Sequence, residues 1–362
     1  MHFPPLSVGR FAWIASFLFL ASSIAVRVSG LVVSLPWNLI TLVCVIAVPF
    51  SVCLHQLSRL ERVNSPLAKG LSLGACLVIL FGWQYALLWP LMALVLWLTR
   101  GTIKLGLRNG RLLLYGAVAL ISSYGVVWNL NYLMVRHMPA NRWDPLIHSM
   151  DLAFYDLLFG RRLEFVGLFP MVHNPWLLVL FDNAYAVLMS EIILVLFLLS
   201  QESSDWPLLK FLQRLFGFYG IAILIYLCFP VNGPHLYYPD HVDLKRSLPG
   251  TVAIAGGMLH DFQISKAGGL LRGFGYFIAV PSLHVLVALF LQHCLYPFAL
   301  LFRIFLPVNI AVCLSTVILG YHYIFDVVAA IAVYILSVVI GGQLGALPSH
   351  RIGGAQSSTQ PQ

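Results

Sequence analysis

Residues 279–296 read AVPSLHVLVALFLQHCLY, and residues 322–343 read HYIFDVVAAIAVYILSVVIGGQ. Each run is about as long as the ~20 residues that an α-helix needs to cross the hydrocarbon of a bilayer. Each also begins with ionisable side chains, His284 in the first run and His322 and Asp326 in the second. The two stretches therefore predict membrane-spanning helices that hold ionisable groups near a membrane surface.

The rest of the chain has the same apolar character. Of its 362 residues, 60% are hydrophobic and 9% are charged, with a mean hydropathy of +0.89, whereas about a quarter of the residues in soluble domains are charged. These numbers predict an all-α fold, a polytopic transmembrane helix bundle. Further spans are expected at 11–28, 31–54, 71–99, 112–135, 176–199, 211–230 and 304–320. Segment 71–99 fits either a tilted helix or a re-entrant hairpin, so the number of spans before residue 110 stays open.

Cysteine usage and net charge exclude several classes of protein. The six cysteines lie in apolar segments and form no CxxC pair, so neither a zinc site nor a disulfide framework is expected. The formal net charge of +8 suits positive inner loops of a membrane protein and does not indicate a nucleic-acid partner. The first apolar segment is followed by more spans, which favours a membrane helix over a cleaved signal. The oligomeric state stays open.

Two polar segments, 136–175 and 231–278, fall on one side of the membrane if the last six spans alternate. The turn at Tyr321 and His322 falls on the same side. By the positive-inside rule the other side is cytoplasmic, because its loops hold Arg100, Lys104, Arg108, Arg111, Arg303 and Arg351. We therefore expect an integral, multi-pass membrane protein with its histidines on the extracytoplasmic face. Residues 344–362 are expected to form a disordered cytoplasmic tail.

Reactive chemistry is expected where the last two apolar runs begin. Pro281 suits the first turn of a helix, whose free backbone N–H groups attract phosphate oxygens, so Ser282 and His284 are candidate phosphate contacts. The HxxxD spacing puts His322 and Asp326 on one helix face, where the carboxylate can hold one ring nitrogen and leave the other to act as a nucleophile. A carboxylate within an apolar span is costly and marks a functional site by default. The pattern favours a phosphate-handling site.

Several polar residues outside these motifs have competing interpretations. Asp182 and Tyr185 lie one turn apart and are candidates either for binding a polyol headgroup or for an interhelical hydrogen bond that fixes packing. Glu191 lies deeper in the same span and is expected to form an interhelical hydrogen bond that fixes packing. Asp144 and Asp151 are seven residues apart and share one face of a short interfacial helix, which is either functional or simply solvated.

The motifs resemble those of the type 2 phosphatidic acid phosphatase superfamily, particularly its inositol phosphorylceramide synthase-like (inositolphosphotransferase) branch. The resemblance covers residues 140–343. Residues 280–284 (VPSLH) are similar to the PSxH motif, and residues 321–326 (YHYIFD) are similar to the branch's HYxxD motif. Weaker similarity extends over residues 144–160 and to Phe229-Pro230 with Gly233-Pro234.

The resemblance implies a six-helix core in which His322 forms a phosphohistidine intermediate, Asp326 orients it and His284 is the acid and base, without a metal or other cofactor. One departure is that Ser315-Thr316 replaces the Ser-Arg pair of the superfamily's hydrolases. A second departure is that the superfamily's first motif, a lysine followed later by Arg-Pro, has no convincing match in this sequence. Cations must still neutralise the negative charge of the phosphoryl group. The candidates lie in the loop before Pro281 and are Arg272, Arg246, Lys245 and Lys266. They are expected either to contact the substrate or to make ordinary contacts with lipid headgroups.

The expected function is that of a metal-independent lipid phosphotransferase or phosphatase, a transferase or hydrolase of lipid metabolism. Its partners would be the bilayer and a phospholipid or other lipid-phosphate substrate. The replaced arginine favours transfer of a substituted phosphoryl group such as phosphoinositol. Hydrolysis of phosphatidate or a prenyl diphosphate is an alternative, and so is a non-enzymatic lipid transporter or scaffold. The expected domains are N-terminal transmembrane helices at 1–135 and a phosphatidic acid phosphatase-like catalytic domain at 136–343.

Overall fold

The structure, a computed structural model, describes residues 7–29, 31–33, 107–137, 143–160, 174–202, 204–237, 249–271 and 277–342. The expected span 71–99 and nearly all of the expected span 31–54 lie outside the described residues. The expected tail at 344–362 and the basic candidates Lys245, Arg246 and Arg272 also lie outside them.

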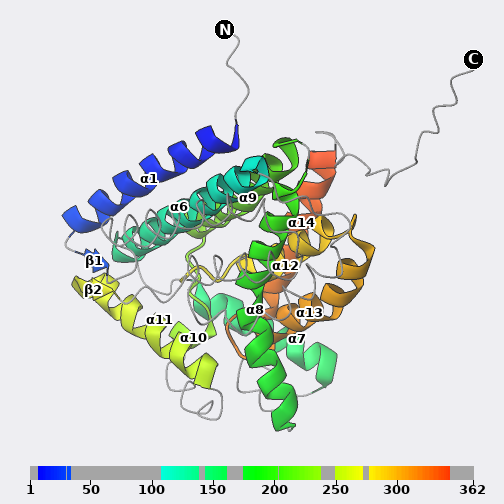
Figure 1. Cartoon of the computed structure of the whole chain (residues 1–362). Helices are drawn as coiled ribbons and strands as arrows, with labels where there is room; N and C mark the ends of the chain where they lie inside the picture. Colours follow the sequence, from blue (N-terminus) through cyan, green and yellow to red (C-terminus); the bar gives the residue numbers. More distant parts are fainter. Residues whose placement is uncertain are drawn as a thin grey trace, which may run out of the picture.

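The described chain is helical apart from two three-residue strands (Figure 1). Its helices are α1 (Val8–Val28), α6 (Leu107–His137), α7 (Asp144–Phe159), α8 (Pro175–Ser200), α9 (Trp206–Cys228), α10 (Pro234–Tyr237), α11 (Pro249–Ala267), α12 (Leu283–Cys294), α13 (Ala299–Ile318) and α14 (Ile324–Gly342). The strands β1 (Leu31–Val33) and β2 (Gly269–Leu271) pair in parallel. The expected helix at 31–54 is therefore wrong in its first three residues, because backbone pairing with β2 holds them extended.

The predicted all-α membrane fold is confirmed. Four described helices are long and apolar enough to cross a membrane, over Val8–Val26, Tyr115–His137, Trp206–Cys228 and Ala299–Ile318. Helix α8 makes a fifth crossing if its halves, Trp176–Tyr185 and Val187–Ser200, count as one span bent by 45°. Several helices of the protein expose large apolar side chains, as a lipid-facing surface requires. Ile335 and Leu336 on α14 are examples. The protein is an integral membrane protein.

The expected span 279–296 is shorter than its apolar composition suggests. Residues 277–282 are not helical, because the N–H of Ala279 donates to the oxygen of Val231 and the N–H of Ser282 to that of Asp326. Pro281 thus precedes the helix instead of lying in its first turn, and Ser282 caps it by accepting from the N–H of Val285 at 3.4 Å. The resulting 12-residue helix α12 spans about 18 Å, less than the ~30 Å of hydrocarbon.

Helix α8 runs through the middle of the bundle and contacts α6, α9, α11, α12 and α13 (Figure 1). All its residues from 191 to 200 are buried. The amide of Asn309 on α13 donates to Glu191 at 2.8 Å and to Gln292 on α12 at 3.0 Å. Glu191 therefore makes the interhelical hydrogen bond expected of it, and this polar contact joins three helices inside an otherwise apolar core.

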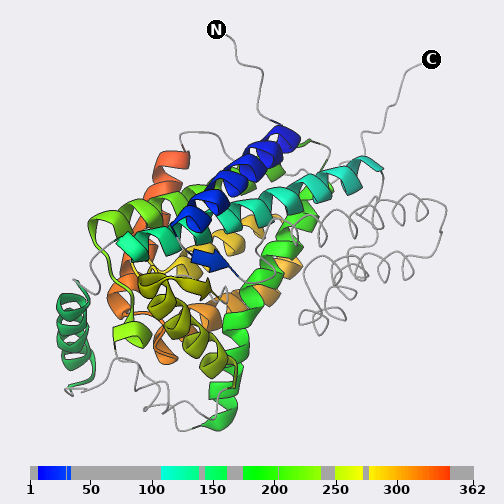
Figure 2. The same cartoon turned by 90° about the vertical axis from the view of Figure 1, so that its left-hand side faces the viewer.

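Helix α1 lies along α6 (Figure 2). Two polar contacts cross this pair: the hydroxyls of Ser16 and Ser122 are 3.1 Å apart, and the amide of Asn129 donates to Ser22 at 3.0 Å. Hydrogen bonds between small polar side chains are a common way to join helices within a membrane. The pairing fixes α6, whose other neighbours include α8, α9 and α11.

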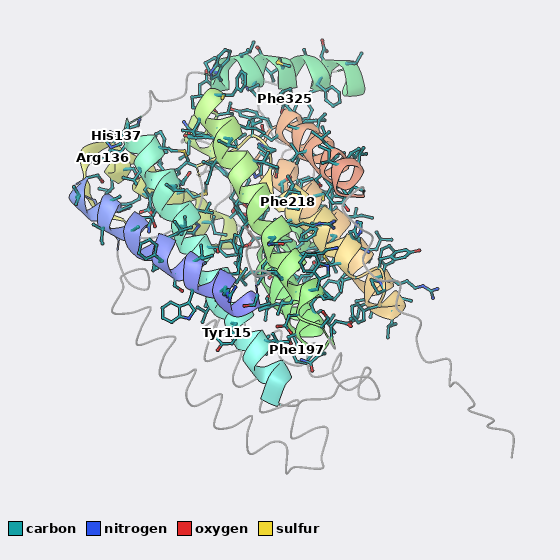
Figure 3. All side chains as sticks on the ribbon, turned by 90° about the horizontal axis from the view of Figure 1, so that it is seen from above. Tyr115, Arg136, His137, Phe197, Phe218 and Phe325 are labelled. Atoms are coloured by element: carbon teal, nitrogen blue, oxygen red, sulfur yellow. The ribbon has the colours of Figure 1, made fainter. Side chains whose placement is uncertain are left out.

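Helix α7 lies across the end of the bundle, next to Phe325 at the start of α14 (Figure 3). Pro145 suits its first turn, and Gly160 ends it with a φ of 61°, a conformation that glycine adopts without strain. The expectation that Asp144 and Asp151 share a face holds, but the face is not solvated, since both side chains are buried. This helix therefore directs two carboxylates into the protein.

Both carboxylates accept backbone N–H groups from segments far from α7 in the sequence. Asp144 accepts from Asn232 and Gly233, each at 3.0 Å. Asp151 accepts from Ile324 at 2.8 Å and Phe325 at 3.0 Å, so it caps the N-terminus of α14 from another helix. Burial raises the pKa of each carboxyl to about 6, although the backbone N–H donors lower it.

We expect Asp151→Asn to destabilise the protein at pH 7 by ~1–3 kcal/mol, because the amide keeps one acceptor oxygen and turns a donor toward the second N–H. Thermal unfolding in a fixed detergent should detect the change. Asp156→Asn, an exposed position on the same helix, should stay within ~0.5 kcal/mol of the wild type. Equal midpoints for all three proteins would contradict a capping role for Asp151.

Candidate active site

The two motifs meet where α12 and α14 begin. His322 is buried, and its Nδ1 lies 3.1 Å from the carbonyl oxygen of Ala279 and 3.3 Å from Oδ2 of Asp326. Both partners are acceptors, so Nδ1 carries the proton and donates to them. The same Oδ2 accepts the N–H of Tyr323 at 2.9 Å. The ring is thereby held in one tautomer, with Nε2 unprotonated when the imidazole is neutral.

His284 lies in the first turn of α12, and its ring centroid is 6.0 Å from that of His322. Its Nδ1 is 3.2 Å from the hydroxyl of Tyr185 on α8, and the two rings stack at 4.0 Å. The structure thus brings both predicted histidines together, close enough for one phosphoryl group to contact both rings. It also gives Tyr185 a position beside His284.

The two histidines differ in the charge of the group that holds Nδ1. His322 faces a carboxylate, which accepts the Nδ1 proton and makes the free nitrogen more electron-rich. His284 faces a neutral hydroxyl, which can accept from or donate to the ring and stabilises the imidazolium less. The arrangement suits His322 for attack on an electrophile and His284 for giving up a proton.

The N-termini of α12 and α14 also differ in what meets their backbone N–H groups. At α14 they are met by the carboxylate of Asp151. At α12 the hydroxyl of Ser282 takes the N–H of Val285, and helix geometry leaves the N–H groups of Leu283 and His284 without an intrahelical acceptor. Such groups favour phosphate oxygens. For Ser282 the structure adds a capping contact, and its part in substrate binding stays a prediction.

The backbone of Thr316, the residue that the resemblance sets against an arginine of the hydrolases, builds the turn that carries His322. Its carbonyl oxygen accepts the N–H groups of Tyr321 at 2.9 Å and His322 at 3.0 Å. Its hydroxyl donates to the oxygen of Cys313 at 2.7 Å. Of the basic candidates only Lys266 is described, exposed in the last turn of α11, so the cation for the phosphoryl group stays a prediction.

Asp182 does not touch either histidine. Its Oδ1 accepts from the hydroxyl of Thr251 on α11 at 2.6 Å, so its role as a headgroup ligand stays a prediction. Next to it lies Tyr321, which stacks on Tyr185 at 4.1 Å and whose hydroxyl pKa is raised mainly by burial and also by Asp182.

The sequence analysis missed His235 as a neighbour of the site. It is buried on α10, and its ring meets the face of Tyr321 edge-on at 4.6 Å. A signal was available, because His235 directly follows the Gly233-Pro234 pair that carries part of the resemblance. Rings from α8, α10, α12 and the turn before α14 therefore form one continuous aromatic cluster at the site.

No group of three or more His, Cys, Asp or Glu side chains that could hold a metal ion occurs within the described ranges. Metal independence itself stays a prediction, since it concerns turnover.

Comparisons with known proteins agree with these motifs at the level of the superfamily. No curated protein and no solved structure matches the sequence. The sequence model of the PAP2 superfamily matches residues 159–340, from the last residue of α7 into α14. The matched segment is half of the chain and contains His284, His322 and Asp326. The protein therefore belongs to the PAP2 superfamily.

Proposed function

We propose that the protein is a lipid phosphotransferase that works by double displacement through a phosphohistidine on His322. The observation that carries the proposal is the pairing of two histidines whose Nδ1 atoms have partners of different charge. Superfamily membership supports an enzyme of the phosphatase or phosphotransferase type acting on lipid phosphates.

In the first step, the lone pair on Nε2 of His322 attacks phosphorus, and the bond from phosphorus to the leaving lipid oxygen breaks. Protonated His284 gives its Nε2 proton to that oxygen, so the lipid leaves as a neutral alcohol. Asp326 and the oxygen of Ala279 hold the Nδ1 proton of His322 throughout. The open N-terminus of α12 would stabilise the equatorial oxygens of the transferring group.

In the second step, an acceptor hydroxyl gives its proton to Nε2 of His284 while its oxygen attacks phosphorus. The bond from phosphorus to Nε2 of His322 breaks, and both histidines return to their starting protonation states. Water as the acceptor gives hydrolysis, and an alcohol gives transfer. The same two residues serve both reactions, so the nature of the acceptor decides the product.

We favour an alcohol acceptor and the inositolphosphotransferase branch, on two grounds. The HYxxD form of the last motif is that branch's form, and Thr316 occupies the position where the hydrolases carry arginine. Asp182 and Thr251, which pair beside Tyr321, are the candidate contacts for a polyol headgroup. On this proposal the catalytic domain spans 136–343, and Arg246, Arg272, Lys245 or Lys266 supplies the missing positive charge.

We predict different losses for the two histidines in rapid-quench trapping with labelled substrate in EDTA. His322→Ala should abolish the acid-labile phosphoenzyme with every substrate. His284→Ala should lose about 10²–10⁴-fold with an alkyl phosphodiester but little with a nitrophenyl ester, whose leaving group needs no proton. Asp326→Asn should slow formation of the phosphoenzyme by orders of magnitude, because the ring of His322 is then no longer held in one tautomer by a carboxylate.

Three results would count against this assignment. Labelling of His322→Ala would put the nucleophile elsewhere. Equal loss with both substrates in His284→Ala would remove its role as the acid. Turnover that disappears in EDTA and returns with magnesium would overturn the metal-independent scheme.

Tyr185→Phe tests whether the hydroxyl positions His284. The ring stack would survive, but Nδ1 of His284 would lose its partner, which we expect to cost about 1–2 kcal/mol, or roughly tenfold in kcat with an alkyl substrate. The nitrophenyl ester should be almost unaffected. Tyr321→Phe is the matched control, since it keeps the same stack and its hydroxyl has no hydrogen bond to either histidine. A loss that is equal for the two substrates would reduce Tyr185 to a packing residue.

We further propose that the site faces away from the cytoplasm. Ser149 on α7 lies at the site's end of the bundle, and Ser204 lies in the turn between α8 and α9 at the other end; both are exposed. In a Cys228→Ser background, a cysteine at position 149 should react with an impermeant thiol reagent on intact cells, and one at 204 only after permeabilisation. The reverse pattern would invert the proposed orientation.

A further inference from the structure

A second polar feature lies at the end of the bundle opposite the histidines. An open cavity is formed by the last turn of α8, the first turns of α9 and the C-terminal end of α12. From the first turn of α12 to its last residue, Cys294, is about 16 Å along the helix axis. The cavity is therefore separate from the catalytic site.

The cavity has cations on one side and apolar walls on the other. Lys210 and Arg214 of α9 line it together with a single acid, Glu202. Arg214 is half-buried, and within the described ranges it has no hydrogen bond or ion pair. Its charge acts on His293, Cys294 and Tyr334, so the guanidinium is near the end of α12. A half-buried cation without a counterion favours an anionic ligand.

The apolar side chains of the cavity indicate what kind of anion fits. Leu199, Phe211, Phe290 and Phe298 line it, and such walls suit acyl chains rather than a free ion. Trp206, which is 50% exposed, and Tyr296, which is 75% exposed, flank the same end of the bundle. Exposed aromatic side chains of this kind mark the interfacial level of a bilayer, and Lys210 lies over the ring of Trp206 at 5.0 Å.

We propose that this cavity binds one anionic phospholipid of the surrounding leaflet, with its phosphate against Arg214 and Lys210 and its chains along the apolar side of the opening. Basic pockets between membrane helices are recognised sites for anionic headgroups. The proposal concerns a bound lipid that is not the substrate, because the site is at the opposite end of α12 from His284. The lipid would bridge α8, α9 and α12, of which α8 and α12 carry Tyr185 and His284 of the catalytic site.

Native mass spectrometry of the protein released from nanodiscs of equal phosphatidylcholine and phosphatidylglycerol tests the proposal. The wild type should retain one phosphatidylglycerol in preference to phosphatidylcholine. Arg214→Gln should reduce that preference about fivefold, as expected for one lost surface cation, and Arg214→Lys should keep it. Arg303→Gln is the matched control, because Arg303 is exposed on α13 at the same end but does not line the cavity.

Each other outcome would overturn the proposal. A wild type without preference, or an Arg214→Gln variant with unchanged preference, would exclude the site. An equal loss in Arg303→Gln would reduce the effect to general surface charge. Displacement of the lipid by millimolar inorganic phosphate would show that the cavity binds a free anion. If Arg214→Gln does not fold, loss of preference in Lys210→Gln against retention in Arg303→Gln decides the question.

Discussion

The active site depends on a small set of hydrogen bonds that tie the segment before α12 to the first turn of α14. The N–H of Ser282 donates to the carbonyl oxygen of Asp326, and Nδ1 of His322 donates to that of Ala279. The two motifs, 38 residues apart in the sequence, are thereby fixed against each other by one backbone hydrogen bond and one side-chain hydrogen bond. Asp151 fixes the same turn from outside by capping α14. The distance between the histidine rings is a consequence of these contacts.

The proposed division of labour between the histidines follows from their hydrogen-bond partners. His322 has a carboxylate beside Nδ1, whereas His284 has a neutral hydroxyl there. The carboxylate of Asp151 also occupies the N-terminus of α14, whereas no carboxylate is bound at that of α12 among the described residues. Phosphate oxygens would therefore be directed to the side of His284, with the nucleophile opposite.

The sequence predicted the contacts that depend on local spacing and missed those that depend on tertiary packing. Asp326 follows His322 by four positions, and this short spacing keeps the two in contact, although His322 lies in the turn before α14 and not on the helix face that the spacing predicted. Tyr185 and His284 are 99 residues apart, and no periodicity relates them, so Tyr185 was assigned to the headgroup instead. Asp144 and Asp151 were placed on one face by their spacing, but their backbone partners come from distant segments that local patterns do not reveal.

The length of α12 shows another limit of reading composition. Apolar content predicted a span of 18 residues at 279–296, yet backbone hydrogen bonds to Val231 and Asp326 hold Ala279 and Ser282 outside the helix. Hydropathy measures the environment of a segment and not its backbone conformation. The superfamily was recognisable from the same residues, because the motif residues carry it whichever of them are helical.

The shortness of α12 has a consequence for the choice between water and an alcohol as acceptor. A helix of about 18 Å within ~30 Å of hydrocarbon cannot bring both of its ends to the level of bulk solvent. If its first turn lies below the headgroups, a phosphoryl group bound there is partly dehydrated. The local activity of water is then reduced, whereas the hydroxyl groups of lipids are already present in the leaflet and compete with it. Partition between membrane and solvent, as much as any single side chain, would then set the ratio of transfer to hydrolysis.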